Sequence, residues 1–231
     1  MRTITLITIG ALVPLALGGC GSSNAKSTSS AAASQPAPAT ASKSSAGHCS
    51  SVQKPAPRPN GGEKKPTLKL NPHRTYTVTV DTNCGTFTFT LDVKDSPHTT
   101  AAFAGLVKKG YFDGLTFHRI VPGFVIQGGD PTGTGAGGPG FHTVDPPPSN
   151  ADYRLGVVAM AKTQTEPAGA AGSQFFVVTG QDAQLPPDYA LLGKVTSGLR
   201  VVEAIGKLGN PADQSGTPTQ VVVMRKVTLK P

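Results

Sequence analysis

The sequence predicts a mainly β domain over residues 74–231, arranged as a closed eight-stranded antiparallel β-barrel with two α-helices. Eight segments of this region have the residue types or the two-residue alternation of strands, and only two segments have helical spacing. Many short strands with few helices are typical of an antiparallel barrel, which closes to avoid exposed edges. Gly and Pro together make up 49 of the 231 residues, so long loops are expected between the strands.

Residues 1–20 are predicted to be an export signal peptide. Arg2 supplies a positive start, and the mostly apolar stretch that follows ends at Leu17, which is short for a membrane-spanning helix. The next residues, Gly-Gly-Cys up to Cys20, complete a pattern that resembles the lipobox of bacterial lipoproteins. This resemblance implies lipidation of Cys20 and an extracytoplasmic protein that is lipid-anchored to the cell membrane. An ordinary cleaved signal peptide with a chance cysteine is the alternative.

Residues 21–73 are predicted to form a disordered linker. The stretch 21–62 is rich in Ser, Ala and Pro and has almost no large apolar residue, so it cannot bury enough surface to offset its ordering entropy. Residues 1–73 carry eight Lys and Arg against one acid, whereas residues 74–231 carry thirteen against twelve. The basic charge therefore belongs to the tail, which fits an anionic membrane surface better than nucleic acid, with plain solubility as the alternative.

Cys49 and Cys84 remain once Cys20 is assigned to lipid. Outside the cytoplasm two thiols are more often paired than free, so a disulfide between Cys49 and Cys84 is expected. The chain has no CxxC or HExxH motif, and its five histidines are scattered. The sequence therefore predicts neither a metal site nor a cofactor.

The domain opens with a predicted hairpin and a helix. Thr75–Val80 and Thr86–Leu91 alternate Thr with apolar or aromatic residues, and the loop between them ends in Gly. Ser96 then provides an N-cap that is followed by proline at the first helical position, and Gly110 closes the helix. The remaining predicted elements are strands at Leu115–Ile120, Phe124–Gln127, Leu155–Ala161, Gln174–Thr179, Ala190–Val195 and Gln220–Leu229, and a second helix at Leu199–Leu208.

Two common functional motifs are excluded. Residues 133–138 match the G-x-G-x-x-G pattern of dinucleotide-binding loops, but that pattern must open a helix whose N-terminus holds the phosphates, and here it leads into Pro139 and Gly140. The stretch is instead predicted to be a surface loop. The G-x-S-x-G pattern of serine hydrolases is absent, so no covalent nucleophile is expected.

Residues 117–130, with the sequence FHRIVPGFVIQGGD, resemble the central signature of the cyclophilin family of peptidyl-prolyl cis/trans isomerases. Gly172–Phe176 (GSQFF), Gly156–Ala161 and Leu191–Val195 are similar to later family motifs, in the same order. The resemblance covers essentially the whole domain. It implies an eight-stranded barrel capped by two helices, and a peptidyl-prolyl isomerase. Together with the export signal, this predicts that Xaa-Pro segments of exported proteins are the partners, and the protein is expected to be a monomer.

The isomerase reaction can be matched to residue chemistry. Rotation about an Xaa-Pro bond has a barrier of about 20 kcal/mol because amide resonance must be lost, and an enzyme lowers it by binding the twisted state best. In that state the proline nitrogen gains a lone pair that can accept a hydrogen bond. Arg119 is the predicted catalytic residue because its guanidinium stays protonated and presents several donors in a rigid fork.

The resemblance also implies the substrate-binding residues. Phe124, Val125, Phe176 and Leu185 would form an apolar cup for the proline ring, Gln127 and the backbone around Ala161 would hold the substrate chain, and Tyr189 would close one wall. Strand alternation places Arg119 on one face and His118 on the other, so His118 is predicted to be a structural, hydrogen-bonded histidine.

The chain departs from the family pattern at three positions. Gln184 stands where many cyclophilins have Trp, which implies reduced cyclosporin sensitivity, and Tyr189 stands where they commonly have His. Lys162 replaces the usual Asn after Ala161. Two other functions remain open: a chaperone or adaptor that binds proline-containing peptides with little turnover, and a nucleic-acid binder that uses the basic tail, which would bind in a salt-sensitive way.

Overall fold

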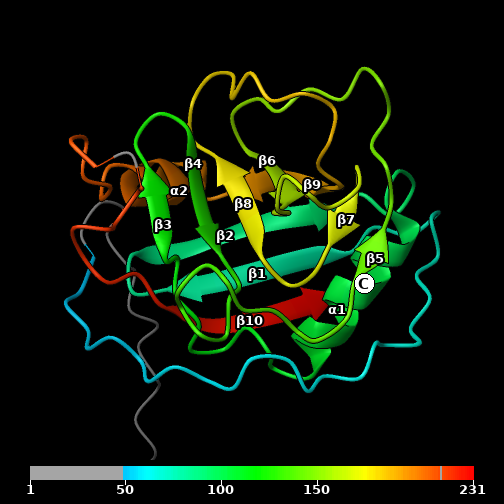
Figure 1. Ribbon diagram of the computed structural model, residues 1–231, viewed down its shortest axis with the longest axis horizontal. Helices are drawn as coiled ribbons and strands as arrows, with labels where there is room; N and C mark the ends of the chain where they lie inside the picture. The colour runs from blue at the N-terminus through cyan, green and yellow to red at the C-terminus, as the bar shows by residue number, and fades with distance from the viewer. Residues whose placement is uncertain (1–48, 214) are drawn as a thin grey trace, which may run out of the picture. The chain divides into compact units, whose positions relative to one another are not determined.

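The computed structural model describes residues 49–213 and 215–231, so the predicted signal peptide and residues 21–48 of the predicted linker lie outside the described residues. One antiparallel sheet of eight strands, in the order β10-β1-β2-β9-β6-β8-β4-β3, makes up most of the domain (Figure 1). The helices are α1 (Pro97–Lys108) and α2 (Leu199–Gly206). The strands are β1 (Thr77–Thr82), β2 (Gly85–Leu91), β3 (Arg119–Val121), β4 (Val125–Gly128), β5 (Thr143–Val144), β6 (Val157–Met160), β7 (Ala170–Ala171), β8 (Phe175–Val178), β9 (Leu191–Ser197) and β10 (Met224–Lys230).

The eight predicted strands and both predicted helices are present, with bounds that shift by a few residues. The largest change is at Leu115–Ile120, of which only the end lies in β3. Two short strands, β5 and β7, were not predicted, and they pair with each other outside the main sheet. Two-residue strands carry no period, so sequence patterning cannot find them.

The sheet is curled but open, and the predicted closed barrel is wrong. β10 and β3 are its edges, and no ladder joins them. Thr116 forms an isolated antiparallel bridge with Val223, and the Phe117 N–H donates to the Val222 carbonyl at 3.0 Å. β3 has only three residues, and the segment just before it meets the start of β10 through an isolated bridge and single hydrogen bonds, not through a continuous ladder that would close the barrel.

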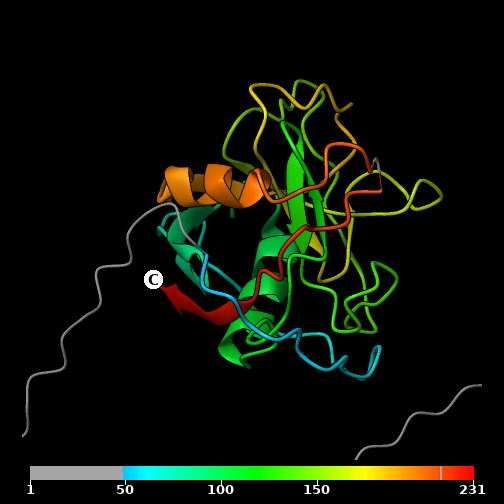
Figure 2. The same cartoon turned by 90° about the vertical axis from the view of Figure 1, so that its left-hand side faces the viewer.

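The two faces of the sheet bury different residues. Along β4, β6 and β8, alternate side chains such as Ile126, Val158 and Val177 point into the main core, where they meet the phenylalanines of β2 and α1. The intervening side chains, including Ala159 and Phe176, belong to a second apolar cluster on the outer face. Figures 1 and 2 show the helices at different sides of the sheet, with α1 against β10 and β5, and α2 against β2, β3 and β4.

The start of α1 is capped differently from the prediction. Ser96 is the N-cap residue and Pro97 occupies the first turn, as predicted, but the Ser96 hydroxyl makes no capping hydrogen bond in the described part of the chain. The Thr99 N–H instead donates to the Asp145 carboxylate at 2.6 Å. A buried carboxylate from a distant loop therefore satisfies the helix end.

Residues 49–73, here called the strap, correct the predicted extent of the linker. The Arg58 N–H donates to the Pro131 carbonyl at 2.8 Å, and Leu68 and Leu70 pack against the main core. The strap therefore lies on the domain rather than forming part of a free linker, although its composition is polar. No helix among the described residues has the length and apolar character needed to cross a membrane.

A disulfide joins Cys49 at the start of the strap to Cys84 in the β1–β2 turn, 35 residues further along the chain. Closing a loop of that length lowers the entropy of the unfolded chain, so the Cys49→Ser, Cys84→Ser double variant should lose about 4 kcal/mol of unfolding free energy. Urea unfolding of the oxidised protein and of the double variant measures this difference. Equal midpoints would show that the cross-link does not stabilise the domain.

Candidate active site

Four residues of the outer sheet face form one cross-strand row. Arg119 of β3 is opposite Gln127 of β4, Gln127 is opposite Phe176 of β8, and Phe176 is opposite Ala159 of β6. Directly opposite residues in an antiparallel sheet present their side chains on the same face. The sheet therefore places a guanidinium, an amide and a phenyl ring side by side, although they are far apart in sequence.

A cavity of about 260 Å³ lies over this row and is called the Arg119 cavity here. It is open to solvent at one side. Its floor is formed by two buried apolar side chains, Val125 and Phe176, which are 2% and 4% exposed. Lys162 and Gln164 line it, and so do all eight residues predicted as catalytic or substrate-binding. These eight are Arg119, Phe124, Val125, Gln127, Ala161, Phe176, Leu185 and Tyr189. The structure thus brings together every residue of the predicted site.

The Arg119 guanidinium stands at one wall of this cavity, 6.0 Å from the centre of the Phe124 ring. Its aliphatic stem packs on Gly216, where an added Cβ would lie 2.8 Å from the Arg119 Cγ. No ion pair or hydrogen bond is formed by the guanidinium within residues 49–213 and 215–231. Arg119 therefore lines the cavity with a packed stem, and its N–H donors have no protein acceptor among the described residues.

Another wall of the Arg119 cavity is formed by Tyr189, which packs on the floor residue Phe176. The rings of Phe176 and Tyr189 meet edge to face with centroids 5.6 Å apart. Tyr153, which sequence reasoning missed, holds this wall from behind: its hydroxyl donates to the Tyr189 carbonyl at 2.6 Å and accepts from the Tyr189 N–H at 3.0 Å. Tyr153 is 1% exposed, and burial raises the pKa of its hydroxyl, so the group stays protonated and able to donate.

Lys162 connects the loop after β6 to the loop that carries Tyr189, beside the Arg119 cavity. Its side chain is only 3% exposed, and its Nζ lies 2.6 Å from a carboxylate oxygen of Asp188 and 5.6 Å from the centre of the Tyr189 ring. The ammonium also donates to the Glu166 carbonyl at 3.1 Å. A buried charge needs such partners, so Lys162 fixes the loop after β6 to the loop that carries Tyr189.

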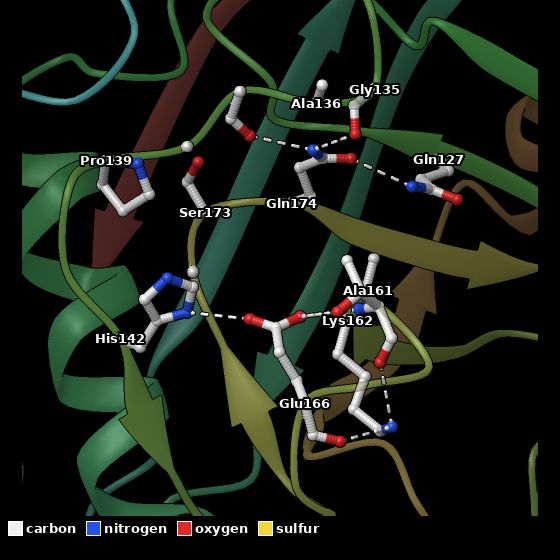
Figure 3. A pocket seen from close by; sticks show the side chains of 14 residues that line it. Gln127, Gly135, Ala136, Pro139, His142, Ala161, Lys162, Glu166, Ser173 and Gln174 are labelled. Atoms are coloured by element: carbon white, nitrogen blue, oxygen red, sulfur yellow. Dashed lines mark hydrogen bonds and ion pairs between the residues drawn. The ribbon is translucent and has the colours of Figure 1, made fainter.

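A second cavity of about 190 Å³ adjoins the first and shares Gln127, Ala161 and Lys162 with it; it is called the Gln174 cavity (Figure 3). Gln174 lies between the loop at Gly135 and the side chain of Gln127, whose amide Nε2 donates to the Gln174 Oε1 at 3.0 Å. The Gln174 Nε2 donates to the Gly135 and Gly137 carbonyls at 2.8 and 2.9 Å.

The far wall of the Gln174 cavity carries charge. The Glu166 carboxylate lies 3.2 Å from the Nδ1 of His142 and accepts from the N–H and hydroxyl of Thr163. Burial alone raises the pKa of Glu166, but the hydrogen bonds from Thr163 and the charge of His142 outweigh it and lower the pKa. Glu166 is therefore ionised at neutral pH.

Asp130 organises the loop that follows it. This loop includes residues 133–138, which match the G-x-G-x-x-G pattern and form a loop as predicted. The Asp130 carboxylate, on a residue 1% exposed, accepts from the Thr132 N–H at 2.7 Å and from the Thr134 N–H at 3.0 Å. Burial alone raises the pKa of Asp130, but the hydrogen bonds from Thr132 and Gly135 outweigh it, so the pKa is lowered.

Because the folded pKa of Asp130 is below that of an unfolded aspartate, the ionised carboxylate stabilises the fold above about pH 3.9, and this stabilisation is lost as the pH falls further. Asp130→Asn should therefore lower the unfolding free energy at pH 7 by about 2 kcal/mol and weaken its acid dependence. Asp182→Asn is the matched control, since Asp182 is exposed and caps only Gln184. Equal losses in both variants, measured by urea unfolding at pH 3 and 7, would contradict this role.

Two further sequence predictions have different outcomes. His118 does not line the Arg119 cavity, as expected, but the predicted hydrogen bond is wrong: neither ring nitrogen has a partner in the described part of the chain. Burial lowers the pKa of His118, which keeps the ring neutral. Gln184 is exposed with a φ of 52° and does not line the cavity, in which the next residue, Leu185, takes part.

Tyr153, Asp188 and Gln164 are the site residues that the sequence did not indicate. Tyr153 stands in an irregular loop, and nothing in its local pattern points to Tyr189. Lys162 had been noticed only as a departure from the family pattern, although a lysine next to a buried strand is itself a signal of a paired charge. Among the described residues, no group of three His, Cys, Asp or Glu side chains is placed to hold a metal ion.

Comparison with known proteins agrees with this geometry. The family model described as cyclophilin type peptidyl-prolyl cis-trans isomerase/CLD matches residues 77–229. The chain is 37% identical over 178 residues to the probable peptidyl-prolyl cis-trans isomerase A of Mycobacterium bovis, covering 69% of this chain and 94% of that protein. It is 43% identical over 112 residues to the peptidyl-prolyl cis-trans isomerase B of Bacillus subtilis, covering 48% of this chain and 76% of that one.

Solved structures give the same result. A cyclophilin type peptidyl-prolyl cis-trans isomerase of Cryptosporidium parvum superposes with a TM-score of 0.62 at 29% identity, covering 68% of this chain and 99% of that one. The same enzyme, solved in the presence of the dipeptide Ala-Pro, gives 0.61 at 31% identity, covering 67% and 99%. With a family match that spans most of the domain and a site that gathers its signature residues, the chain belongs to the cyclophilin family of peptidyl-prolyl cis-trans isomerases.

Proposed function

We propose that this isomerase binds Xaa-Pro segments of exported proteins in the Arg119 cavity, as a monomer held at the outer side of the cell membrane by lipid on Cys20. The observation that carries the proposal is the cross-strand row that sets the Arg119 guanidinium, which has no hydrogen-bond or ion-pair partner among the described residues, beside an apolar floor. The Ala-Pro dipeptide used with the Cryptosporidium relative supports the choice of ligand.

The proline ring would rest on Phe176 and Val125, between Phe124 and Leu185. A dry floor binds the ring in both isomers and in the twisted state alike, so by itself it gives affinity and no rate increase. The rate increase comes from Arg119, which would donate to the proline nitrogen only when resonance is lost and that nitrogen has a lone pair. No bond is made or broken, and the guanidinium keeps its proton throughout.

The substrate chain on either side of the proline needs polar partners. The Gln127 side chain donates to Gln174 through its nitrogen, which leaves its carbonyl oxygen able to accept a substrate N–H. The backbone at Ala161 lies between the Arg119 and Gln174 cavities, where an extended peptide would pass. Both groups are in place before substrate binds, which reduces the ordering cost of binding.

Exchange NMR on an Xaa-Pro peptide tests this function directly. The domain should speed interconversion of the cis and trans signals at catalytic concentration, and the effect should depend on Arg119. A domain that broadens or shifts the peptide signals without speeding interconversion would instead be a binding module, such as a chaperone or adaptor.

The membrane anchor is tested separately in bacterial cells that express the full chain. The wild-type protein should be in the membrane fraction, with acyl chains on Cys20 detected by mass spectrometry, because two or more chains give lasting attachment. Cys20→Ala should move the protein to the soluble fraction, and Ser22→Ala should not. Membrane retention of Cys20→Ala would contradict the lipid anchor. The proposed role of residues 21–48 as a linker to that anchor would then also lapse.

A further inference from the structure

The strap lies outside the region that matches the family model, which begins at residue 77, yet it bonds to a loop that lines the Gln174 cavity beside the substrate site. It passes below β10 and continues beside α1 (Figures 1 and 2, blue to cyan). On the way it runs along the outer side of the loop of residues 135–139, whose inner side lines the Gln174 cavity. A segment outside the matched region thus backs one wall of that cavity.

Three hydrogen bonds join the strap to this loop. The Gly138 N–H donates to the Asn60 Oδ1 at 2.9 Å, the Gly61 N–H donates to the Gly138 carbonyl at 2.9 Å, and the Glu63 N–H donates to the Pro139 carbonyl at 2.9 Å. The approach is close, because a Cβ added at Gly140 would lie 2.9 Å from the backbone nitrogen of Gly62.

The strap is itself fixed on the domain at both sides of these bonds. The Arg58 side chain donates to the Tyr111 carbonyl and lies 5.4 Å from the centre of the Tyr111 ring. Glu63 pairs at 2.9 Å with Lys109, the residue that follows α1. The hydrogen bonds to the loop are therefore flanked on both sides by contacts that hold the strap on the domain.

The inner side of the same loop holds Gln174. The Gly135 and Gly137 carbonyls accept both N–H groups of the Gln174 amide, so the Gln174 oxygen must point to Gln127 (Figure 3). That oxygen accepts the Gln127 N–H, and the Gln127 oxygen is left for substrate. A displaced loop would free Gln174 to rotate, and Gln127 would lose its fixed orientation in the Arg119 cavity.

We propose that the strap is a positioning element of the substrate site: it holds the 135–139 loop from outside, and through Gln174 it fixes the amide orientation of Gln127. This inference rests on the proposed function, since it assumes that the Arg119 cavity binds Xaa-Pro peptides. The strap acts on substrate affinity and not on the Arg119 step, because it contacts neither the guanidinium nor the apolar floor.

The test is Asn60→Ala, which removes one acceptor from an exposed position and leaves the disulfide and the core intact. KM for an Xaa-Pro peptide should rise about threefold with kcat unchanged, the effect of about one net hydrogen bond. The side-chain amide NMR signals of Gln127 and Gln174 should shift. Asn60→Asp keeps the acceptor and should restore both values.

Asn71→Ala is the matched control, since among the described residues the Asn71 side chain bonds to His73 of the strap and to no residue of the 135–139 loop. It should change neither KM nor the glutamine signals. A folded Asn60→Ala protein with unchanged KM and unchanged glutamine signals overturns the proposal, as does a loss of stability alone. If Arg119→Ala retained full activity, the proposed function would fail, whereas the glutamine signals would still report whether the strap positions Gln127.

Discussion

Replacing Arg119 with alanine is expected to lower kcat/KM for Xaa-Pro isomerisation by about 10²- to 10³-fold, the usual cost of removing a donor that acts in the transition state. The fold should be unchanged, because the guanidinium has no partner within the described chain and only its stem packs on Gly216. Exchange NMR with an Xaa-Pro peptide measures the rate, and a urea unfolding curve checks the fold.

Two variants distinguish the role of the Arg119 hydrogen-bond donors from the effect of a positive charge alone. Arg119→Lys keeps the positive charge but loses the fork of donors, so it should recover only part of the activity. Arg154→Ala removes an exposed arginine that pairs with Asp152 outside the cavity, and it should leave the rate unchanged. An Arg119→Ala protein with more than half of the wild-type rate would refute the mechanism.

Replacing Phe176 with alanine is expected to have the second largest effect, because the ring is both packed and part of the cavity floor. It is 4% exposed and meets Tyr189 edge to face and Tyr153 at 6.4 Å. Removing a buried phenylalanine costs about 3–5 kcal/mol of unfolding free energy. Peptide affinity should also fall, since the proline ring would lose its apolar floor.

The neighbouring residue separates these two effects. Phe175 is 1% exposed and points to the main core on the opposite face, where it meets Phe103 at 5.6 Å. Phe175→Ala should lose comparable stability but keep its peptide affinity wherever it remains folded. Peptide titrations at a temperature at which both variants are folded decide the matter. Equal affinities in the two variants would show that Phe176 is core and not a binding surface.

The strands and helices were predictable because their signals are local. The alternation that predicts β1 and β2 involves only neighbouring residues within each strand. The start and end signals of α1 are equally local: Ser96 and Pro97 at its start, and Gly110 after its end. The membership of the site was predictable from the signature residues, but only through their resemblance to a family. Alternation alone accounts for Val125 and Gln127 on one face of β4, but not for Phe124, which precedes the strand.

Tertiary contacts decided the rest. The sheet stays open between β3 and β10 because of how two segments distant in sequence meet. The ion pair of Lys162 with Asp188 joins two loops that are also distant in sequence. The strap was predicted to be a linker because its composition is polar. Its order comes from backbone hydrogen bonds and a disulfide to residues that lie later in the chain. The sequence by itself thus determined the elements and the chemistry of the site, whereas the support around the site came from long-range contacts, many of them to backbone groups, whose partners residue types do not specify.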